Sequence, residues 1–167
     1  MKKGFQIFVG ICAAILTIYG LVQGIQQITN RAPKEVSQQE LMIYLQQLAP
    51  VAQNIGESIQ KIAPVYNQKP AANENQKKAV LHQLAQTENQ FKGFSKRMEQ
   101  VSPPQAIKEF HEQVRHSIEG YLQAFGMTRQ GFEQDNVKMI DEGASLLEKS
   151  SAQLNDASQE IARTSTK

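Results

Sequence analysis

The sequence predicts an all-α protein, in which an N-terminal transmembrane helix is followed by an up-down-up-down four-helix bundle. No charged side chain occurs in residues 4–30, and the centre of this stretch, residues 7–22, is almost continuously apolar. After residue 36, apolar residues recur at alternating spacings of four and three. This coiled-coil-like heptad spacing is typical of long helices that pack at shallow angles.

Composition excludes several classes of protein. The 18 basic and 16 acidic residues are interspersed and give a net charge of +2, so there is no basic block for nucleic-acid binding. Cys12 is the only cysteine, which excludes an intramolecular disulfide. It follows Ile11 rather than the small residue that precedes a lipidated cysteine, so lipidation is not expected.

Residues 1–30 are predicted to be a membrane anchor. About 20 apolar residues in a helix cross a bilayer core roughly 30 Å thick. Lys2 and Lys3 precede the apolar stretch, and basic residues favour the cytoplasmic side. We therefore expect a single-pass protein of the cell membrane, with a cytoplasmic N-terminus and the helical domain outside. The alternative is secretion after signal cleavage, although Val22-Gln23-Gly24 is a poor cleavage site.

Small residues share one face of the predicted anchor. They recur at alternating spacings of three and four, and are Gly10, Ala13, Thr17, Gly20 and Gly24. Small residues four apart let two helix backbones approach closely in lipid. This glycine face is predicted to pack on a second copy or on a partner's anchor. The alternative is that glycine and alanine are simply common in membrane helices.

The bundle is predicted to begin after a hinge at residues 31–36. Ser37 and Glu40 fit a capping box at the start of a helix over residues 37–68. Pro50 and Pro64 lie opposite its apolar seam and are expected to bend it. The alternative for Pro64 is that the helix ends there. The predicted seam consists of Leu41, Leu45, Leu48, Ala52, Ile55, Ile59, Ile62 and Tyr66.

A polar loop precedes a second predicted helix over residues 76–101, which contains Gly93. A third helix is predicted over residues 103–134, with Ser102 as its N-cap and proline at its first position. The seams of these two helices are Val80, Leu84, Thr87, Phe91, Phe94, Met98 and Val101, then Ile107, His111, Val114, Ile118, Tyr121, Phe125, Thr128 and Phe132.

The fourth helix is predicted over residues 137–163, capped by Asp135-Asn136, and residues 164–167 are expected to be a disordered tail. Its seam is Ile140, Ala144, Leu147, Ser151, Leu154, Ser158 and Ile161. Four helices of similar length with short connections favour antiparallel packing around one core over residues 37–163. The alternative is a three-helix domain from which the first soluble helix extends as a stalk.

No catalytic, metal or cofactor site is predicted, so the chain is not expected to be an enzyme. His111 and His116 lie five residues apart, about 140° around a helix, and are too far apart for the zinc pattern that uses a spacing of four. Aromatic residues gather in the second and third helices. They are expected either to fill the core or, with a histidine, to line a pocket for an apolar ligand. That possible pocket comprises Phe91, Phe94, His111, Tyr121 and Phe125.

The stretch PPQAIKEFHEQVRHSIEGYLQAF, followed by a capped helix ending in EIAR, resembles an arrangement in small bacterial envelope proteins. Those proteins are membrane-anchored or lipidated helical bundles of uncharacterised function. The resemblance implies a bacterial origin and a bundle. The chain is also similar to the four-helix sensor domain of chemoreceptors, although no second membrane helix follows Ile161.

The sequence thus favours a non-enzymatic, membrane-anchored interaction or accessory subunit of the bacterial cell envelope. Its expected partners are the membrane and either a second copy or a membrane protein, and no nucleic acid. The alternative is a sensor-like extracytoplasmic module that binds a small apolar ligand.

Overall fold

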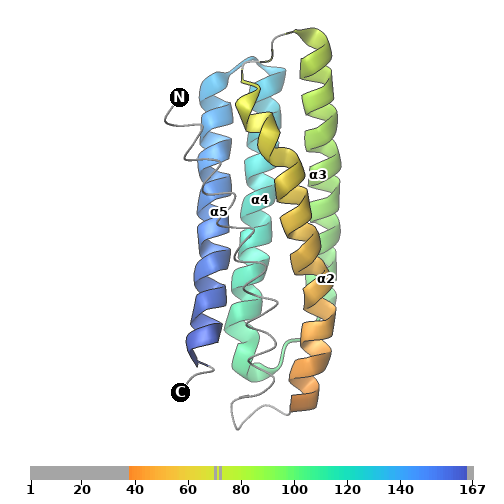
Figure 1. Cartoon of the computed structure of the whole chain (residues 1–167), viewed down its shortest axis with the longest axis vertical. Helices are drawn as coiled ribbons and strands as arrows, with labels where there is room; N and C mark the ends of the chain where they lie inside the picture. Colours follow the sequence, from red (N-terminus) through yellow and green to blue (C-terminus); the bar gives the residue numbers. More distant parts are fainter. Residues whose placement is uncertain (1–37, 70, 72, 165–167) are drawn as a thin grey trace.

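The computed structural model describes residues 38–69, 71 and 73–164, and these form an all-helical bundle (Figure 1). Successive α-helices run in opposite directions along the long axis (Figure 1). The elements in order are α2 (Gln38–Ile62), the 3-10 helix η1 (Ala63–Asn67), α3 (Glu74–Gln100), the 3-10 helix η2 (Gln105–Ile107), α4 (Lys108–Glu133) and α5 (Val137–Thr164). The prediction of an all-helical bundle is therefore confirmed.

Three predicted segments lie outside the described residues: the anchor at residues 1–30, the hinge at residues 31–36, and residues 165–167 of the tail. The cap at Ser37 also lies outside them. Within the part of the chain that the structure describes, no helix is both long enough and apolar enough to cross a membrane.

Asparagine side chains begin two of the helices. Asn73 Oδ1 accepts a hydrogen bond from the Gln76 backbone N–H at 2.9 Å, at the start of α3. Asn136 Oδ1 accepts from the Met139 backbone N–H at 3.2 Å, as predicted for the last helix. Asp135, just before this cap, has φ 52°, the left-handed conformation that Asp and Asn tolerate best among non-glycine residues. The resulting tight turn places α5 directly against α4.

The first predicted helix is shorter than expected as an α-helix. It ends at Ile62 and continues as the 3-10 helix η1, in which Pro64 occupies one of the first two positions. A proline inside an α-helix removes a hydrogen bond and clashes with the carbonyl four residues earlier, whereas the first turn tolerates it. Pro50, by contrast, lies within α2. The α-helix therefore does not bend at Pro64 but ends just before it, which is the alternative given for this proline.

The predicted start of the third helix is wrong. Ser102 does not cap it, because Pro104 has an extended backbone (φ −55°, ψ 146°) and the helix α4 begins only at Lys108, after η2. Proline disfavours the helical conformation in the residue before it. Two consecutive prolines, Pro103 and Pro104, therefore hold residues 102–103 out of the helix.

The predicted seams form the core. Nearly all of their members within the described side chains are buried, and only Val101, Ile107 and Ser158 are half-buried. Ile59 of α2 is fully buried, so the stalk alternative is wrong. Buried apolar residues that the strict heptad spacing did not include are Tyr44, Val51, Val65, Phe110, Ala124 and Ala157.

α4 and α5 make the tightest pair of helices. Small buried residues recur every seven positions on each helix; they are Ser117, Ala124 and Gly131 on α4, and Gly143, Ser150 and Ala157 on α5. A Cβ atom added at Gly143 would overlap Thr128 Oγ1 and come within 2.9 Å of the Ala124 carbonyl oxygen. The two backbones can be this close only because these side chains are small.

The remaining helices pack in chain order, α2 on α3 and α3 on α4, and within the described range α2 and α5 do not pack closely on each other. Ser58 of α2 donates to Gln90 Oε1 of α3 at 3.0 Å. Arg129 of α4 donates to Glu88 Oε1 of α3 at 2.8 Å. Direct helix packing thus closes three sides of the bundle. On the fourth side, among the described residues, α2 and α5 make few direct contacts.

Candidate functional site

Four of the five residues of the predicted ligand pocket pack on one another. The Phe91 ring lies edge-on to those of Phe94, Tyr121 and Phe125, with centroid separations of 5.3, 5.3 and 5.0 Å. These are favourable distances for aromatic pairs. All four side chains are buried. The rings themselves occupy the space between α3 and α4 that a ligand would need.

The Tyr121 hydroxyl is the polar group among these four side chains, and it forms a hydrogen bond within the protein. Tyr121 donates its hydroxyl hydrogen to Ser151 Oγ at 2.9 Å, and Ser151 donates to the Leu147 carbonyl at 2.9 Å. Burial raises the pKa of Tyr121 to about 12, so the phenol stays protonated at neutral pH. Among the described side chains, every buried nitrogen or oxygen atom has a hydrogen-bond partner. The cluster therefore offers no buried group that awaits a ligand.

His111, the fifth residue, lies elsewhere. It is ten positions before Tyr121, about 15 Å along α4. Its ring packs on Tyr44 of α2, with centroids 5.9 Å apart, and Nδ1 lies 3.3 Å from the Tyr44 hydroxyl. It also forms a hydrogen bond with the backbone of Met98 at the end of α3. One imidazole thus joins three helices.

The environment of His111 favours the neutral imidazole. Desolvation is the largest effect and lowers the pKa of His111; the Arg115 charge lowers it further. The Glu112 carboxylate and the hydrogen bond to Met98 oppose this and raise the pKa. The net shift is downward, so at neutral pH the ring acts as a hydrogen-bonded core residue.

The two histidines that resemble a zinc motif face different surroundings. His111 is buried, whereas His116 is exposed and lies 3.3 Å from Glu119 Oε2. Throughout the described residues, no group of three or more His, Cys, Asp or Glu side chains is arranged to hold a metal ion. The predicted glycine face of the anchor (Gly10, Ala13, Thr17, Gly20 and Gly24) lies outside those residues.

A surface that the sequence did not indicate lies at the end of the bundle where α2 begins. Met42 and Ile43 are adjacent, and 44% and 49% of their surfaces are exposed. Beside them is a depression of about 380 Å³ between the first turns of α2 and the connection that leads from α3 to α4. We call this surface the end patch; it comprises Met42 and the lining residues Glu40, Ile43, Tyr44, Gln47, Gln100, Ser102, Pro103 and Pro104.

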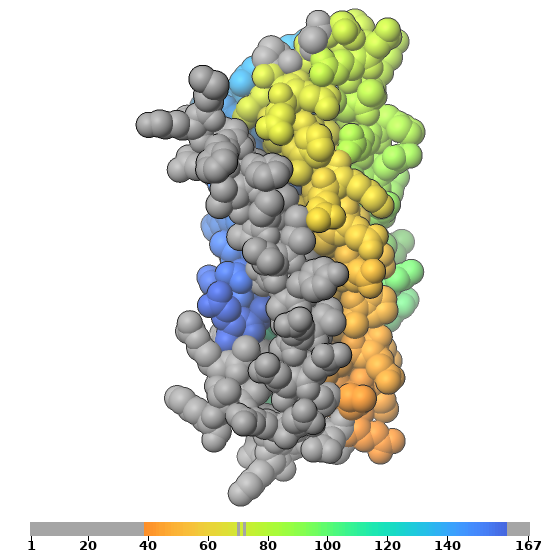
Figure 2. All heavy atoms as spheres, in the orientation of Figure 1, coloured from red at the N-terminus to blue at the C-terminus, as the bar shows by residue number. Residues whose placement is uncertain are grey.

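The chemistry of the end patch suits binding rather than catalysis. Its lining combines apolar side chains with the amides of Gln47 and Gln100 and the Ser102 hydroxyl. Among the described lining residues, Glu40 is the one that carries a charge. Figure 2 shows that the first turns of α2, coloured orange, lie at one end of the molecule and contribute to its surface. The available signal in the sequence is Met42-Ile43, two large apolar residues that fall off the seam.

Comparison of the chain with protein-family models, with curated proteins and with solved structures finds no match. The functional assignment therefore depends on the residues and geometry described above.

Proposed function

We propose that this chain is a non-enzymatic interaction subunit of the bacterial cell envelope, which residues 1–30 anchor in the membrane and which binds a membrane protein through the end patch. The observation that carries the proposal is the exposure of Met42 and Ile43 at the end of the bundle to which residues 1–37 are attached. Contiguous exposed apolar surface on a folded domain commonly marks an interaction site.

The anchor and the end patch are close in sequence. Residues 31–37 are seven residues, which span at most about 25 Å when fully extended. If residues 1–30 cross the bilayer, the first turn of α2 therefore lies near the membrane surface. A membrane protein beside the anchor would be within reach of Met42 and Ile43. This arrangement favours a membrane-embedded or membrane-proximal partner over a freely diffusing one.

The lining of the end patch also suggests the chemistry of the partner. Met42 and Ile43 offer apolar contact, and methionine adapts its shape to a partner more readily than branched side chains do. The amides of Gln47 and Gln100 can each donate and accept hydrogen bonds. A complementary surface would present an apolar side chain that enters the depression and polar backbone or side-chain groups around it.

The test is site-specific photo-crosslinking of the full-length protein in its own membranes. A photoreactive residue replaces Ile43, and the matched control carries it at Val137. Val137 is also exposed and β-branched, but it lies at the start of α5, at the other end of the bundle. We expect one dominant membrane protein to crosslink at position 43 but not at position 137.

Equal crosslinking from both positions would contradict a specific interface at the end patch. Crosslinks between copies of this chain alone would replace the proposed partner with self-association.

Protease-accessible tags at the two ends test the orientation, since protection of the C-terminal tag in intact cells would place the bundle on the cytoplasmic side.

A further inference from the structure

His111 connects the two walls of the depression in the end patch. One wall is formed by the first turns of α2 and includes Tyr44, and the other is formed by the end of α3 and the connection after it, from Gln100 to Pro104. The Nδ1 atom of His111 lies 3.3 Å from the Tyr44 hydroxyl. The same ring bonds to the backbone of Met98, two residues before Gln100. All these segments lie at one end of the bundle (Figure 1).

The Met98 carbonyl is also the point at which α3 ends. The Val101 N–H donates to it at 3.3 Å, and the backbone becomes extended at Val101 (ψ 122°) before Ser102 and two prolines. A carbonyl oxygen has two lone pairs, so it can accept from both Val101 and the imidazole of His111. The position of the ring is thus coupled to the place where the chain leaves α3 for the end patch.

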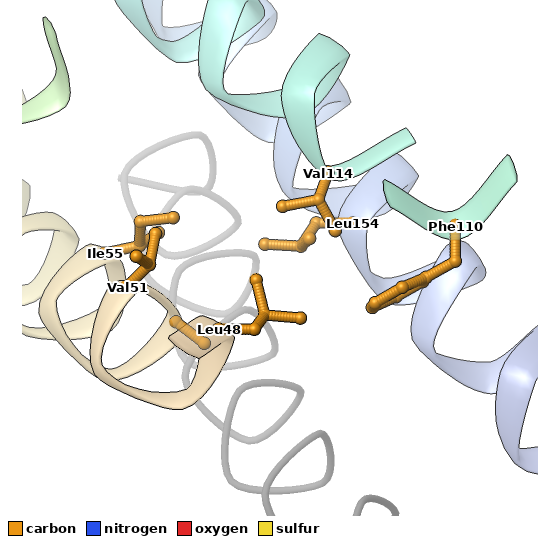
Figure 3. A pocket seen from close by; sticks show the side chains of 7 residues that line it. Leu48, Val51, Ile55, Phe110, Val114 and Leu154 are labelled. Atoms are coloured by element: carbon orange, nitrogen blue, oxygen red, sulfur yellow. The ribbon is translucent and has the colours of Figure 1, made fainter. Parts of the chain in front are cut away.

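The interior beside His111 is unfavourable for a positive charge. In Figure 3, Phe110, the residue before His111 on α4, points toward Leu48 of α2 across a cavity. Every described side chain that lines this cavity is apolar. Its volume is about 10 Å³, at the lower limit for a single water molecule. This side of the ring therefore provides neither an acidic partner nor space for hydration.

Among the described residues, the charges that act on His111 come from its own helix. Glu112 favours the protonated ring and Arg115 favours the neutral one. These two side chains also pair with each other at 3.2 Å. From α2 the facing titratable group is Tyr44, whose pKa is raised by burial, so its phenol stays protonated at neutral pH. The exposed charged residues nearest in sequence to the contacts on α2 and α3 are Glu40, Arg97 and Glu99.

We propose that His111 is a proton switch for the end patch, in which protonation of the ring separates the start of α2 from the end of α3 and abolishes partner binding. This inference rests on the proposed function, because it concerns the regulation of the same surface. A proton from solvent binds Nδ1 and turns this acceptor into a donor. The Tyr44 hydroxyl then has to find another acceptor in a buried site, and the charged ring is more stable in water.

α2 is the helix best placed to respond to this change. It packs less closely on α3 than α4 does, whereas α4 and α5 make the tightest pair. Ser58, which bonds α2 to α3, lies 14 residues after Tyr44, about 21 Å along the helix. The first turns of α2 can therefore move while the later turns keep their contacts.

The first test repeats the crosslinking from position 43 in membranes equilibrated at about pH 7.5 or about pH 5.5, on either side of the ordinary histidine pKa. The crosslink to the partner should weaken on acidification, by up to about tenfold for each pH unit below the pKa of His111, because one proton is taken up. His111→Gln should crosslink equally at both pH values, since glutamine can accept from Tyr44 and donate to Met98 without a change of charge. The matched control is His116→Gln, an exposed residue of the same helix, which should keep the pH dependence.

A second test needs no partner. Hydrogen exchange of the purified full-length protein in detergent is measured at the same two pH values and corrected for the intrinsic effect of pH on exchange. Residues 38–47 and 98–102 should exchange faster at the lower pH, whereas residues 131–137, at the other end of the bundle, should not. If His111→Gln does not fold, Tyr44→Phe is the second variant. It removes a hydrogen bond to the neutral ring, so the transition should move to higher pH.

The outcomes separate the two proposals. Equal crosslinking of the natural sequence at both pH values would overturn the switch, and so would the same pH dependence in His111→Gln. No crosslink from position 43 at either pH would instead contradict the proposed function. The exchange rates would still test the switch in that case, because unchanged exchange of residues 38–47 on acidification would overturn it.

Discussion

The Tyr44 hydroxyl lies 3.3 Å from Nδ1 of His111, and this contact joins α2 to α4 across 67 residues of sequence. A neutral imidazole has one donor and one acceptor nitrogen, so it can accept from Tyr44 at Nδ1 while its other nitrogen donates. The hydrogen bond to the Met98 backbone fits that second role. Protonation would turn Nδ1 into a donor and change this arrangement.

Stability should therefore depend on pH through His111. Burial lowers the pKa of His111 below its ordinary value of about 6.5. The unfolded chain then binds a proton at a higher pH than the folded chain, so the free energy of unfolding falls as pH drops through about 6.5. Urea unfolding at about pH 7.5 and about pH 5.5 should show a larger loss for the natural sequence than for His111→Gln. Equal losses for the natural sequence and His111→Gln would contradict this role. The control is His82→Gln, on the exposed surface of α3, which should lose as much stability as the natural sequence.

Removal of the Tyr44 hydroxyl should test the contact itself. Tyr44→Phe keeps the ring but leaves Nδ1 of His111 without this partner, which should cost about 1 kcal/mol of unfolding free energy. In a double-mutant cycle with His111→Gln, the two losses should not add. Additive losses, measured by urea unfolding at neutral pH, would show that the two side chains do not interact.

The close approach of α4 and α5 predicts opposite effects for two Gly→Ala changes. Gly143→Ala should destabilise the bundle by about 1–3 kcal/mol, because its Cβ would meet Thr128 and the backbone of Ala124. Gly126→Ala should stabilise it by about 0.5–1 kcal/mol, since nothing lies within 4 Å of an added Cβ and alanine favours helix. Thermal or urea unfolding of both variants measures the difference, and the same sign for both would contradict the packing.

Pro50 should weaken α2, whereas Pro64 should not. Pro50 lies inside α2 and is exposed, so Pro50→Ala should raise the free energy of unfolding by about 1–2 kcal/mol. Pro64 occupies the start of η1, where proline is well tolerated, and Pro64→Ala should change stability by less than about 0.5 kcal/mol. Circular dichroism during urea unfolding tests both. A larger gain at position 64 would contradict this distinction.

Residue spacing was sufficient to predict the helices and most of the core. A seam such as Leu41, Leu45 and Leu48 depends only on local periodicity, which the sequence displays directly. Tyr44 lies beside this seam, and whether it is buried depends on the helix that packs on that edge. The prediction of Ser102 as a cap failed for a local reason. Pro104 disfavours the helical conformation at Pro103, so the helix cannot begin directly after Ser102, although serine is a good capping residue.

The candidate sites were harder to predict, because they depend on which segments meet. Spacing along α4 grouped His111 with Tyr121, yet its partners are Tyr44 and Met98 on two other helices. The end patch similarly needs the first turns of α2 beside residues 102–104. Neither juxtaposition has a periodic signal in the sequence.

The small residues between α4 and α5 also have a consequence for the timing of folding. These helices are joined by a turn of only a few residues, so their contacts are local and should form quickly once both are available. A ribosome makes them last, because chains are synthesised from the N-terminus. The contacts between α4 and α5 therefore form only after the other described helices have been synthesised.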